Sequence, residues 1–232
     1  MRIIILFVIL ILFSVNTNAQ IKNKNILDKG IYILPTQLIF PEIILSYEHF
    51  IKKRISLSYS LGYKIPIGKG ETFNEVGHGG YAIYEYQYMF NKFSNAVYIS
   101  IAPSFYFKNR RYFLQAEFFN RIYWFDRKQL TFNNIETYRY SSIRSERNNV
   151  TGIKILAGIN LKKEMSKSLF LNIKLYYGFG LRYKTGNYEN INYKYIDIHN
   201  VETKIPYLKE YKSTVVPSFH LGIKIGIAKK IE

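Results

Sequence analysis

The chain is dominated by segments in which apolar and polar residues alternate with a period of two. Residues 55–65 read Ile-Ser-Leu-Ser-Tyr-Ser-Leu-Gly-Tyr-Lys-Ile, so one set of alternate positions is apolar and the other holds serine, glycine and lysine. The same alternation recurs at 153–161, 169–183 and 219–228. Successive side chains of a β-strand point to opposite faces, so each segment predicts a strand with one apolar and one polar face.

The alternation predicts ten strands, joined in turn by short and long connections. The short turns would be 52–54, 91–95, 126–129 and 163–168, and the longest connections 68–80 and 184–212. Even strand numbers with this arrangement are typical of bacterial membrane barrels. Eight strands stay an alternative, because 131–141 is weakly patterned and Pro41 makes the first hairpin tight. The predicted strands are 31–40, 42–51, 55–67, 81–90, 96–107, 112–125, 131–141, 150–162, 169–183 and 213–228.

Three features favour a membrane barrel over a soluble β-sandwich. The apolar faces are longer than those of the usual strand of about five or six residues in globular proteins. Tyrosine and phenylalanine lie near strand ends, where aromatic girdles meet the membrane interface. The polar faces hold mostly serine, glycine, asparagine and single charges, which suits a narrow polar lumen. Because an open sheet edge cannot be satisfied in lipid, the sheet must close. The sequence therefore predicts an all-β fold, a closed antiparallel transmembrane β-barrel of eight to ten strands, with ten favoured.

The N-terminus has the three parts of a secretory signal peptide. Arg2 is followed by an unbroken apolar run over 3–13 and then by a polar stretch that ends in Thr17-Asn18-Ala19. The apolar run is too short for a membrane anchor of about 20 residues, so cleavage is expected after Ala19. The predicted organisation is a signal peptide at 1–19, a short periplasmic segment at 20–30 and the barrel domain at 31–232.

Composition and charge change this picture only a little. With no cysteine, disulfide scaffolds, zinc–thiolate sites and a lipid-anchored N-terminus are excluded. Lysine and arginine number 33 against 16 acids, a formal charge of +17 that could indicate nucleic-acid binding. An exported protein does not meet nucleic acid, so the basic residues need another explanation.

Some of these charges fall on the predicted inward faces. An eight- to ten-stranded barrel is filled by side chains or holds at most one small ligand, so we expect an internal ion-pair network. A narrow anion-selective path is the alternative, but charge selectivity needs an open pore. The predicted network is Glu48, Lys64, Glu85, Glu117, Arg121, Lys154, Lys174, Arg182 and Lys224.

Other basic residues cluster at the ends of predicted strands. Phosphates of membrane lipids are the natural anions at that height. We therefore predict lipid-phosphate contacts, on the outer side of the membrane, for Lys108, Arg110, Arg111, Arg144 and Arg147.

The sequence offers little catalytic chemistry. The four histidines at 49, 78, 199 and 220 are scattered, and a zinc site needs several convergent ligands. Ser46, Glu48 and His49 are close in sequence, but alternation puts His49 on the opposite face from the other two. We expect no catalytic residue, no cofactor and no metal site.

The segments ILSYEHF (44–50), ISLSYSLGYKI (55–65) and HLGIKIGIA (220–228), after a signal peptide, resemble small outer-membrane β-barrel proteins of the porin-like superfamily. The resemblance implies an integral protein of a Gram-negative outer membrane, inserted by the barrel-assembly machinery, with no shared catalytic residues. One departure is the C-terminus, which ends Ala-Lys-Lys-Ile-Glu instead of with the aromatic residue common in such barrels.

The expected function is a structural, surface-binding or envelope-maintenance role, with outer-membrane lipid and glycolipid as partners. One alternative is a membrane component of a protein-export or surface-assembly complex. Others are a narrow channel and a lipid-modifying barrel enzyme.

Overall fold

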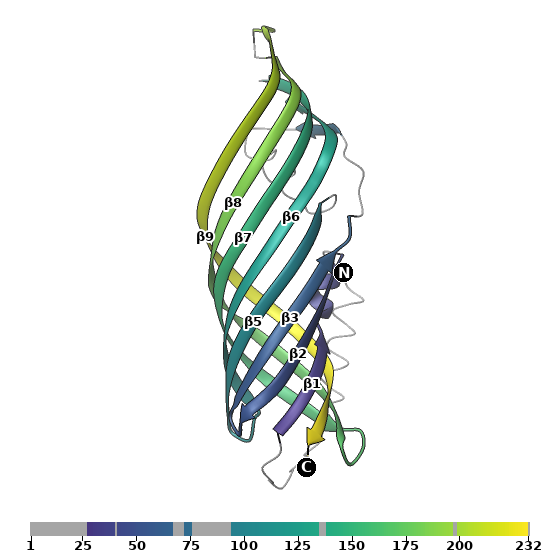
Figure 1. Ribbon diagram of the computed structural model, residues 1–232, viewed down its shortest axis with the longest axis vertical. Helices are drawn as coiled ribbons and strands as arrows, with labels where there is room; N and C mark the ends of the chain where they lie inside the picture. Colours follow the sequence, from purple (N-terminus) through teal and green to yellow (C-terminus); the bar gives the residue numbers. More distant parts are fainter. Residues whose placement is uncertain are drawn as a thin grey trace.

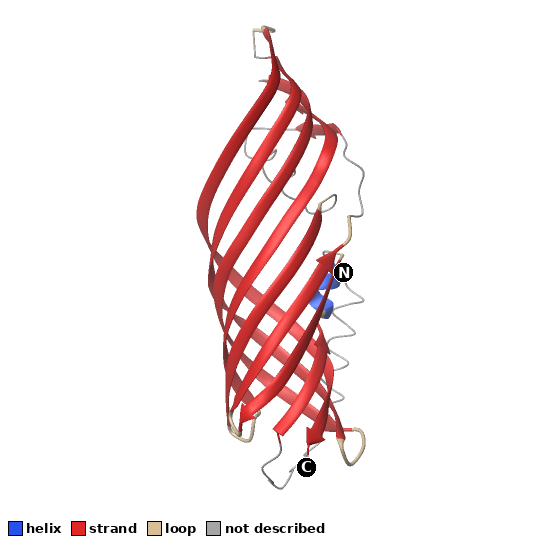
Figure 2. Ribbon diagram, in the orientation of Figure 1, coloured by secondary structure: helices blue, strands red, loops and turns tan. Residues whose placement is uncertain are grey.

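The computed structural model describes residues 27–39, 41–66, 72–75, 94–134, 138–196 and 199–231. The predicted signal peptide and the predicted strand 81–90, with Glu85, lie outside these residues. Strands make up nearly all of the described chain (Figure 2), beside one short 3-10 helix, η1, at Pro35–Ile39. In the described residues no helix is both long and apolar enough to cross a membrane.

The strands lengthen from the N-terminal to the C-terminal half of the chain. Tilted strands wrap around a common axis in Figure 1. Their bounds are β1 Leu27–Ile33, β2 Glu42–Lys52, β3 Ile55–Lys64, β4 Thr72–Glu75, β5 Asn95–Phe107, β6 Tyr112–Asn134, β7 Tyr138–Glu164, β8 Leu169–Ile196 and β9 Glu202–Ile231.

Eight of these strands form a closed antiparallel ring. The order is β1-β2-β3-β5-β6-β7-β8-β9, and β9 pairs back with β1. The short β4 lies beside the far end of β6 in parallel and is not part of the ring. The predicted all-β closed barrel is confirmed. The favoured count of ten is not, because the ring of described strands closes with eight.

One predicted strand and two predicted connections are wrong for the same reason. The segment 131–141 is not a strand of its own, because it holds the end of β6 and the start of β7. The predicted turn 126–129 lies inside β6, at a bulge between Phe125 and Lys128, and the predicted loop 184–212 is mostly β8 and β9. These hairpins continue beyond the apolar part of the barrel, where both faces of a strand carry mostly polar residues. Alternation therefore disappears although the strand continues.

The two ends of the barrel differ. One end, here called the turn end, carries the short turns β2–β3, β5–β6 and β7–β8 together with the start of β1 and the end of β9 (Figure 1). At the other, the extended end, β6 to β9 project well beyond β2, β3 and β5. β1 begins earlier than the predicted strand 31–40, at Leu27, and ends at Ile33. It is shorter than predicted because η1 replaces the rest of the predicted strand.

The ring is closed over only part of its length. β1 pairs with β9 only over Leu27–Ile33 and 225–231. From 202 to 224, β9 therefore has β8 as its one strand neighbour among the described residues. Pro206 and Pro217 lie in this stretch, as expected for a free edge, because proline cannot donate to a ladder. Beyond the closed section, the described strands β6 to β9 continue side by side as a curved, open sheet.

A continuous apolar band surrounds the exterior. On β8 the odd-numbered residues from Leu169 to Tyr183 are all apolar or aromatic, and on β9 the same holds from Val215 to Ile227. Several are widely exposed, among them Leu221 at 75%. A polar border row ends the band toward the extended end, formed by neighbouring residues of three strands: Asn149, Thr185 and Ser213. Toward the turn end, Lys29 and Lys229 are exposed and stand opposite each other on β1 and β9.

Candidate functional site: the lumen and its mouth

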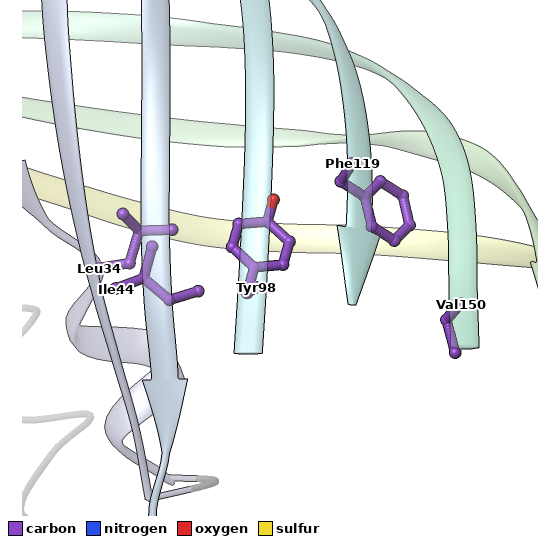
Figure 3. Packing of buried hydrophobic residues seen from close by; sticks show 5 residues of the cluster. All are labelled: Leu34, Ile44, Tyr98, Phe119 and Val150. Atoms are coloured by element: carbon purple, nitrogen blue, oxygen red, sulfur yellow. The ribbon is translucent and has the colours of Figure 1, made fainter. Parts of the chain in front are cut away.

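Two apolar clusters cross the lumen at different heights. The lower cluster, nearer the turn end, consists of Phe50, Tyr106, Phe113, Leu156 and Tyr176. The upper cluster consists of Leu34, Ile44, Tyr98, Phe119 and Val150, which come from five different strands or their ends (Figure 3). All ten side chains are buried. Each cluster thus occupies the barrel cross-section with side chains from several walls.

Charged side chains lie between the two clusters. This follows from the order of lumen-facing residues along β2, β6 and β7, because each of these three strands carries a charged residue between a member of the upper and a member of the lower cluster. The order is Ile44, Glu48, Phe50 on β2; Phe119, Glu117, Phe113 on β6; and Val150, Lys154, Leu156 on β7. The middle of the lumen is therefore a charged compartment with an apolar layer on either side.

The first ion pair of this compartment joins β2 to β8 across the lumen. Lys174 Nζ donates to Glu48 Oε2, and both side chains are almost fully buried. Ser56 Oγ and Tyr106 OH donate to Glu48 Oε1 at 2.6 and 2.7 Å. Lys174 Nζ also donates to Tyr106 OH at 2.7 Å. The carboxylate thus has hydrogen bonds on both oxygens, which a buried charge requires.

The second pair joins β6 to its neighbour β7. Lys154 Nζ lies 2.7 Å from Glu117 Oε1 and 4.4 Å from the centre of the Phe119 ring. Tyr98 OH donates to the same carboxylate oxygen, and Gln115 donates to the other at 3.2 Å. The upper cluster therefore contributes a hydroxyl to the charged compartment as well as an apolar surface.

A third pair lies on the other side of the upper cluster. Arg121 Nη2 is 2.9 Å from Glu42 Oε2. Lys64, which faces Glu42 across the β2–β3 ladder, donates to the carbonyl and hydroxyl oxygens of Ser94 at 2.5 and 3.2 Å. Sequence reasoning missed Glu42, although alternation places it on the same face as Glu48.

Glycines on the wall make room for lumen-filling rings. A Cβ at Gly158 would lie 2.5 Å from Cζ of Phe113, and one at Gly222 would collide with the Tyr176 hydroxyl. Real Cβ atoms do not approach other atoms so closely, so these positions tolerate no side chain while the rings stay in place. These two rings of the lower cluster thus pack directly over the backbone of the neighbouring strand, where each glycine is the paired residue.

Lys224 and Arg182, like Lys64, have no ion pair among the described residues. Lys224 is 4% exposed, stands opposite Lys174 on the β8–β9 ladder and lies 5.9 Å from the centre of the Tyr176 ring. Arg182 is the next basic residue on the same wall toward the extended end, and its Nε is buried without a hydrogen-bond partner. This wall of the lumen is therefore electropositive.

Histidine chemistry is limited to one contact. Ser218 Oγ and His220 Nε2 are 2.8 Å apart on the lumen face of β9, a pair that sequence reasoning did not assemble. No described carboxylate is hydrogen-bonded to the other ring nitrogen, so an orienting acid is missing from the described residues. His49 faces outward, stacked between Tyr47 and Tyr59 at 5.8 and 6.0 Å. No group of three potential metal ligands occurs in the described part of the chain.

The five residues predicted to contact lipid phosphate are not brought together. Lys108, Arg110 and Arg111 lie at the turn end, whereas Arg144 and Arg147 lie toward the extended end on β7. Their placement on one side is therefore wrong, because 108–111 is the short β5–β6 turn. Phosphate contact itself stays a prediction.

Two of the five, Arg110 and Arg144, also form a hydrogen bond or an ion pair within the protein. The Arg110 guanidinium lies 3.9 Å from the centre of the Phe50 ring, and its Nε donates to the Lys53 carbonyl at 2.9 Å. Arg144 pairs with Glu146 at 3.1 Å on the inner face. Glu146 was missed because the predicted strand began only at 150. Lys108, Arg111 and Arg147 are the exposed members of the set.

Comparisons with known proteins give one structural likeness. No family model and no curated protein matches the chain. Among solved structures, the chain is similar to a major outer membrane protein from Thermus thermophilus, with 10% sequence identity and a TM-score of 0.41. The alignment covers 90% of this chain and 100% of that chain. At this identity and TM-score the likeness says nothing about what the chain does.

Proposed function

We propose that the chain is an integral outer-membrane β-barrel of a Gram-negative envelope, with a lumen closed by its own side chains. Its role is structural or surface-binding, and it has no catalytic activity. Outer-membrane lipid and glycolipid are its partners, and the barrel-assembly machinery inserts it. The observation that carries the proposal is the combination of an apolar exterior with a polar, charged interior, which is the reverse of a soluble β-barrel.

The height of the apolar band supports membrane insertion. On β8 the outward apolar row runs from Leu169 to Tyr183. At a rise of ~3.3 Å per residue and a tilt of ~45°, this row is about 33 Å high, close to the ~30 Å of a bilayer core. A band of this size exposed to water would promote aggregation, whereas in lipid it is matched.

The orientation follows from the connections. Bacterial barrels have short periplasmic turns and longer outer segments. The turn end then faces the periplasm, and the extended end, with the open sheet of β6 to β9, projects outside. Exposed Lys29, Lys163 and Lys229 would lie at the height of the inner-leaflet phosphates, where each basic residue contributes about 1 kcal/mol of attraction.

The two apolar layers in series favour a closed lumen over a channel. Ions cross an apolar constriction only if it opens and fills with water. Purified protein in a planar bilayer should therefore show no steady conductance, while cell fractionation should recover it in the outer membrane. A stable single-channel current from the unmodified protein would contradict the closed lumen, and recovery in the periplasm would contradict membrane insertion.

A lipid-modifying enzyme is the second candidate, because Ser218 and His220 form a nucleophile–base contact. Phospholipid turnover by the purified protein, lost in Ser218→Ala and in His220→Ala, would support this candidate. Equal turnover in the unmodified protein and both variants would leave the non-catalytic role in place.

A further inference from the structure

A pocket opens on the inner face of β8 and β9, next to the polar border row. Its volume is about 370 Å³. This lies near the lower end of the range for small-ligand sites, about 300–1,000 Å³. Its lining residues are Lys184, Gly186, Tyr188, Lys212, Ser213 and Thr214. Every one of these side chains except glycine carries a hydrogen-bond donor.

The pocket is electropositive. Lys184 and Lys212 line it, and Arg182 is the next inward-facing residue of β8. Lys184 and Arg182 have no ion pair among the described residues. The nearby acids are already engaged, since Glu210 lies 3.4 Å from Lys212 and Glu146 pairs with Arg144. Positive charge therefore exceeds negative charge at this site.

An unsatisfied acceptor lies beside the pocket, next to the lining residue Gly186. Asn148 is 1% exposed, and its amide nitrogen donates to Glu146 at 2.7 Å. Its carbonyl oxygen, Oδ1, is buried and has no hydrogen-bond partner in the described structure. A side chain at Gly186 would collide with this oxygen, so the glycine makes room for Asn148 beside the pocket. A buried acceptor without a donor costs about 1–3 kcal/mol, so Asn148 is a costly residue at this position.

Tyr188 contributes a hydroxyl, and two cations lie close to its ring. Arg144 Cζ lies 4.6 Å and Lys212 Nζ 5.7 Å from the centre of its ring. Burial raises the pKa of the Tyr188 hydroxyl, and the charge of Glu146 raises it further. The hydroxyl therefore stays protonated at neutral pH and can donate to an anion.

We infer that this pocket binds the phosphate and an adjacent hydroxyl of a phosphorylated sugar. The two lysines and the Tyr188 hydroxyl suit phosphate oxygens, and the hydroxyls of Ser213 and Thr214, which both donate and accept, suit a sugar hydroxyl. A nucleobase would compete with Arg144 and Lys212 for the Tyr188 ring, and a fatty-acid chain would need an apolar lining.

The position of the pocket gives a membrane glycolipid access to it. Ser213 belongs both to the pocket lining and to the polar border row, which lies at headgroup height in the proposed orientation. Among the described strands, β9 has no neighbour other than β8 at this height, so the pocket lies at the edge of the described sheet. The phosphorylated sugar can thus come from an outer-leaflet glycolipid or from free solute. Only this choice of source rests on the proposed function.

The test is titration calorimetry of the full chain in detergent micelles with N-acetylglucosamine 1-phosphate. Lys184→Gln/Lys212→Gln should weaken binding at least tenfold. The matched control is Lys163→Gln/Lys209→Gln, which removes the same charge from exposed positions outside the pocket and should change binding less than twofold. Inorganic phosphate should bind at least several-fold more weakly than the sugar phosphate, and unphosphorylated N-acetylglucosamine should not bind measurably.

Three results would overturn the inference: no binding of the sugar phosphate, equal weakening by both double variants, or equal affinity for inorganic phosphate. Vesicles that contain a phosphorylated glycolipid, compared with its dephosphorylated form, identify the source. Association that depends on the phosphate and on Lys184 and Lys212 supports the glycolipid, whereas binding of the soluble sugar phosphate alone supports free solute. Both lysines lie outside the closed lumen, so the variants should still insert and still not conduct, which separates this test from that of the proposed function.

Discussion

The pair of Glu48 and Lys174 gives the sharpest test of the lumen network. Glu48→Gln keeps the shape of the side chain but removes the negative charge, so Lys174 stays buried opposite a neutral amide. Two charges 4 Å apart attract by about 4 kcal/mol at an effective dielectric constant of about 20. Measured costs of removing one partner from a buried pair are about 3–5 kcal/mol. We expect Glu48→Gln to lower the free energy of unfolding by about 3–5 kcal/mol.

A double-mutant cycle separates the ion pair from loss of packing. Glu48→Gln/Lys174→Met removes both charges, so it should cost well below the sum of the two single variants, with a coupling energy of at least about 2 kcal/mol. Glu189→Gln is the control, because Glu189 pairs with Lys209 at 3.3 Å on the exposed surface, where such pairs contribute about 0–1 kcal/mol.

The assay is urea unfolding in lipid vesicles, followed by the fluorescence of Trp124, the one tryptophan of the chain. A loss below about 1 kcal/mol for Glu48→Gln would refute the reasoning. Costs that simply add in the double variant would refute it as well, since the two charges would then not depend on each other.

Three further predictions concern the two apolar clusters in the lumen, the apolar band on the exterior and a glycine that makes room for a lumen ring. Phe113→Ala/Phe119→Ala should produce a measurable bilayer conductance while neither single variant does, because each apolar cluster closes the lumen alone; a current from either single variant would contradict two layers in series. Leu221→Lys should destabilise the barrel in vesicles by about 2–4 kcal/mol in urea unfolding, the cost of a cation on the lipid face. Tyr211→Lys, beyond the polar border row, is its control and should cost less than about 1 kcal/mol; equal effects would place the band elsewhere. Gly158→Ala should lower the free energy of unfolding by about 1–3 kcal/mol through overpacking against the Leu175 carbonyl and the Phe113 ring, and an unchanged urea midpoint would contradict the tight packing at this position.

Much of the lumen lining could be predicted from the sequence, because the face on which a side chain lies depends only on its position within its own strand. The period of two placed Glu48, Glu117, Lys154 and Lys174 on one face without knowledge of the fold. It did not give their partners, since Glu48 and Lys174 are 126 residues apart and meet across the lumen. Their meeting depends on strand number, tilt and stagger, which together fix what lies opposite in a closed barrel.

The mouth of the lumen was harder to predict. Asn148, Gly186 and Lys212 lie where β7 to β9 leave the apolar band, and there both faces of a strand are polar. No alternation marks these residues, so the sequence pattern predicts loops there instead of strands. The strands continue because their backbone groups pair with neighbouring strands, an interaction that side-chain patterning does not reveal.

By itself, the sequence determined the class of fold and the two faces of each strand within the band, because the pleat of a strand turns local alternation into an inside and an outside. Only the tertiary structure decided that eight strands close the ring, which charges pair across it, and that a basic pocket stands at its mouth. These features depend on pairing between segments distant in the chain, and the free energy of that pairing is set by the closed sheet as a whole.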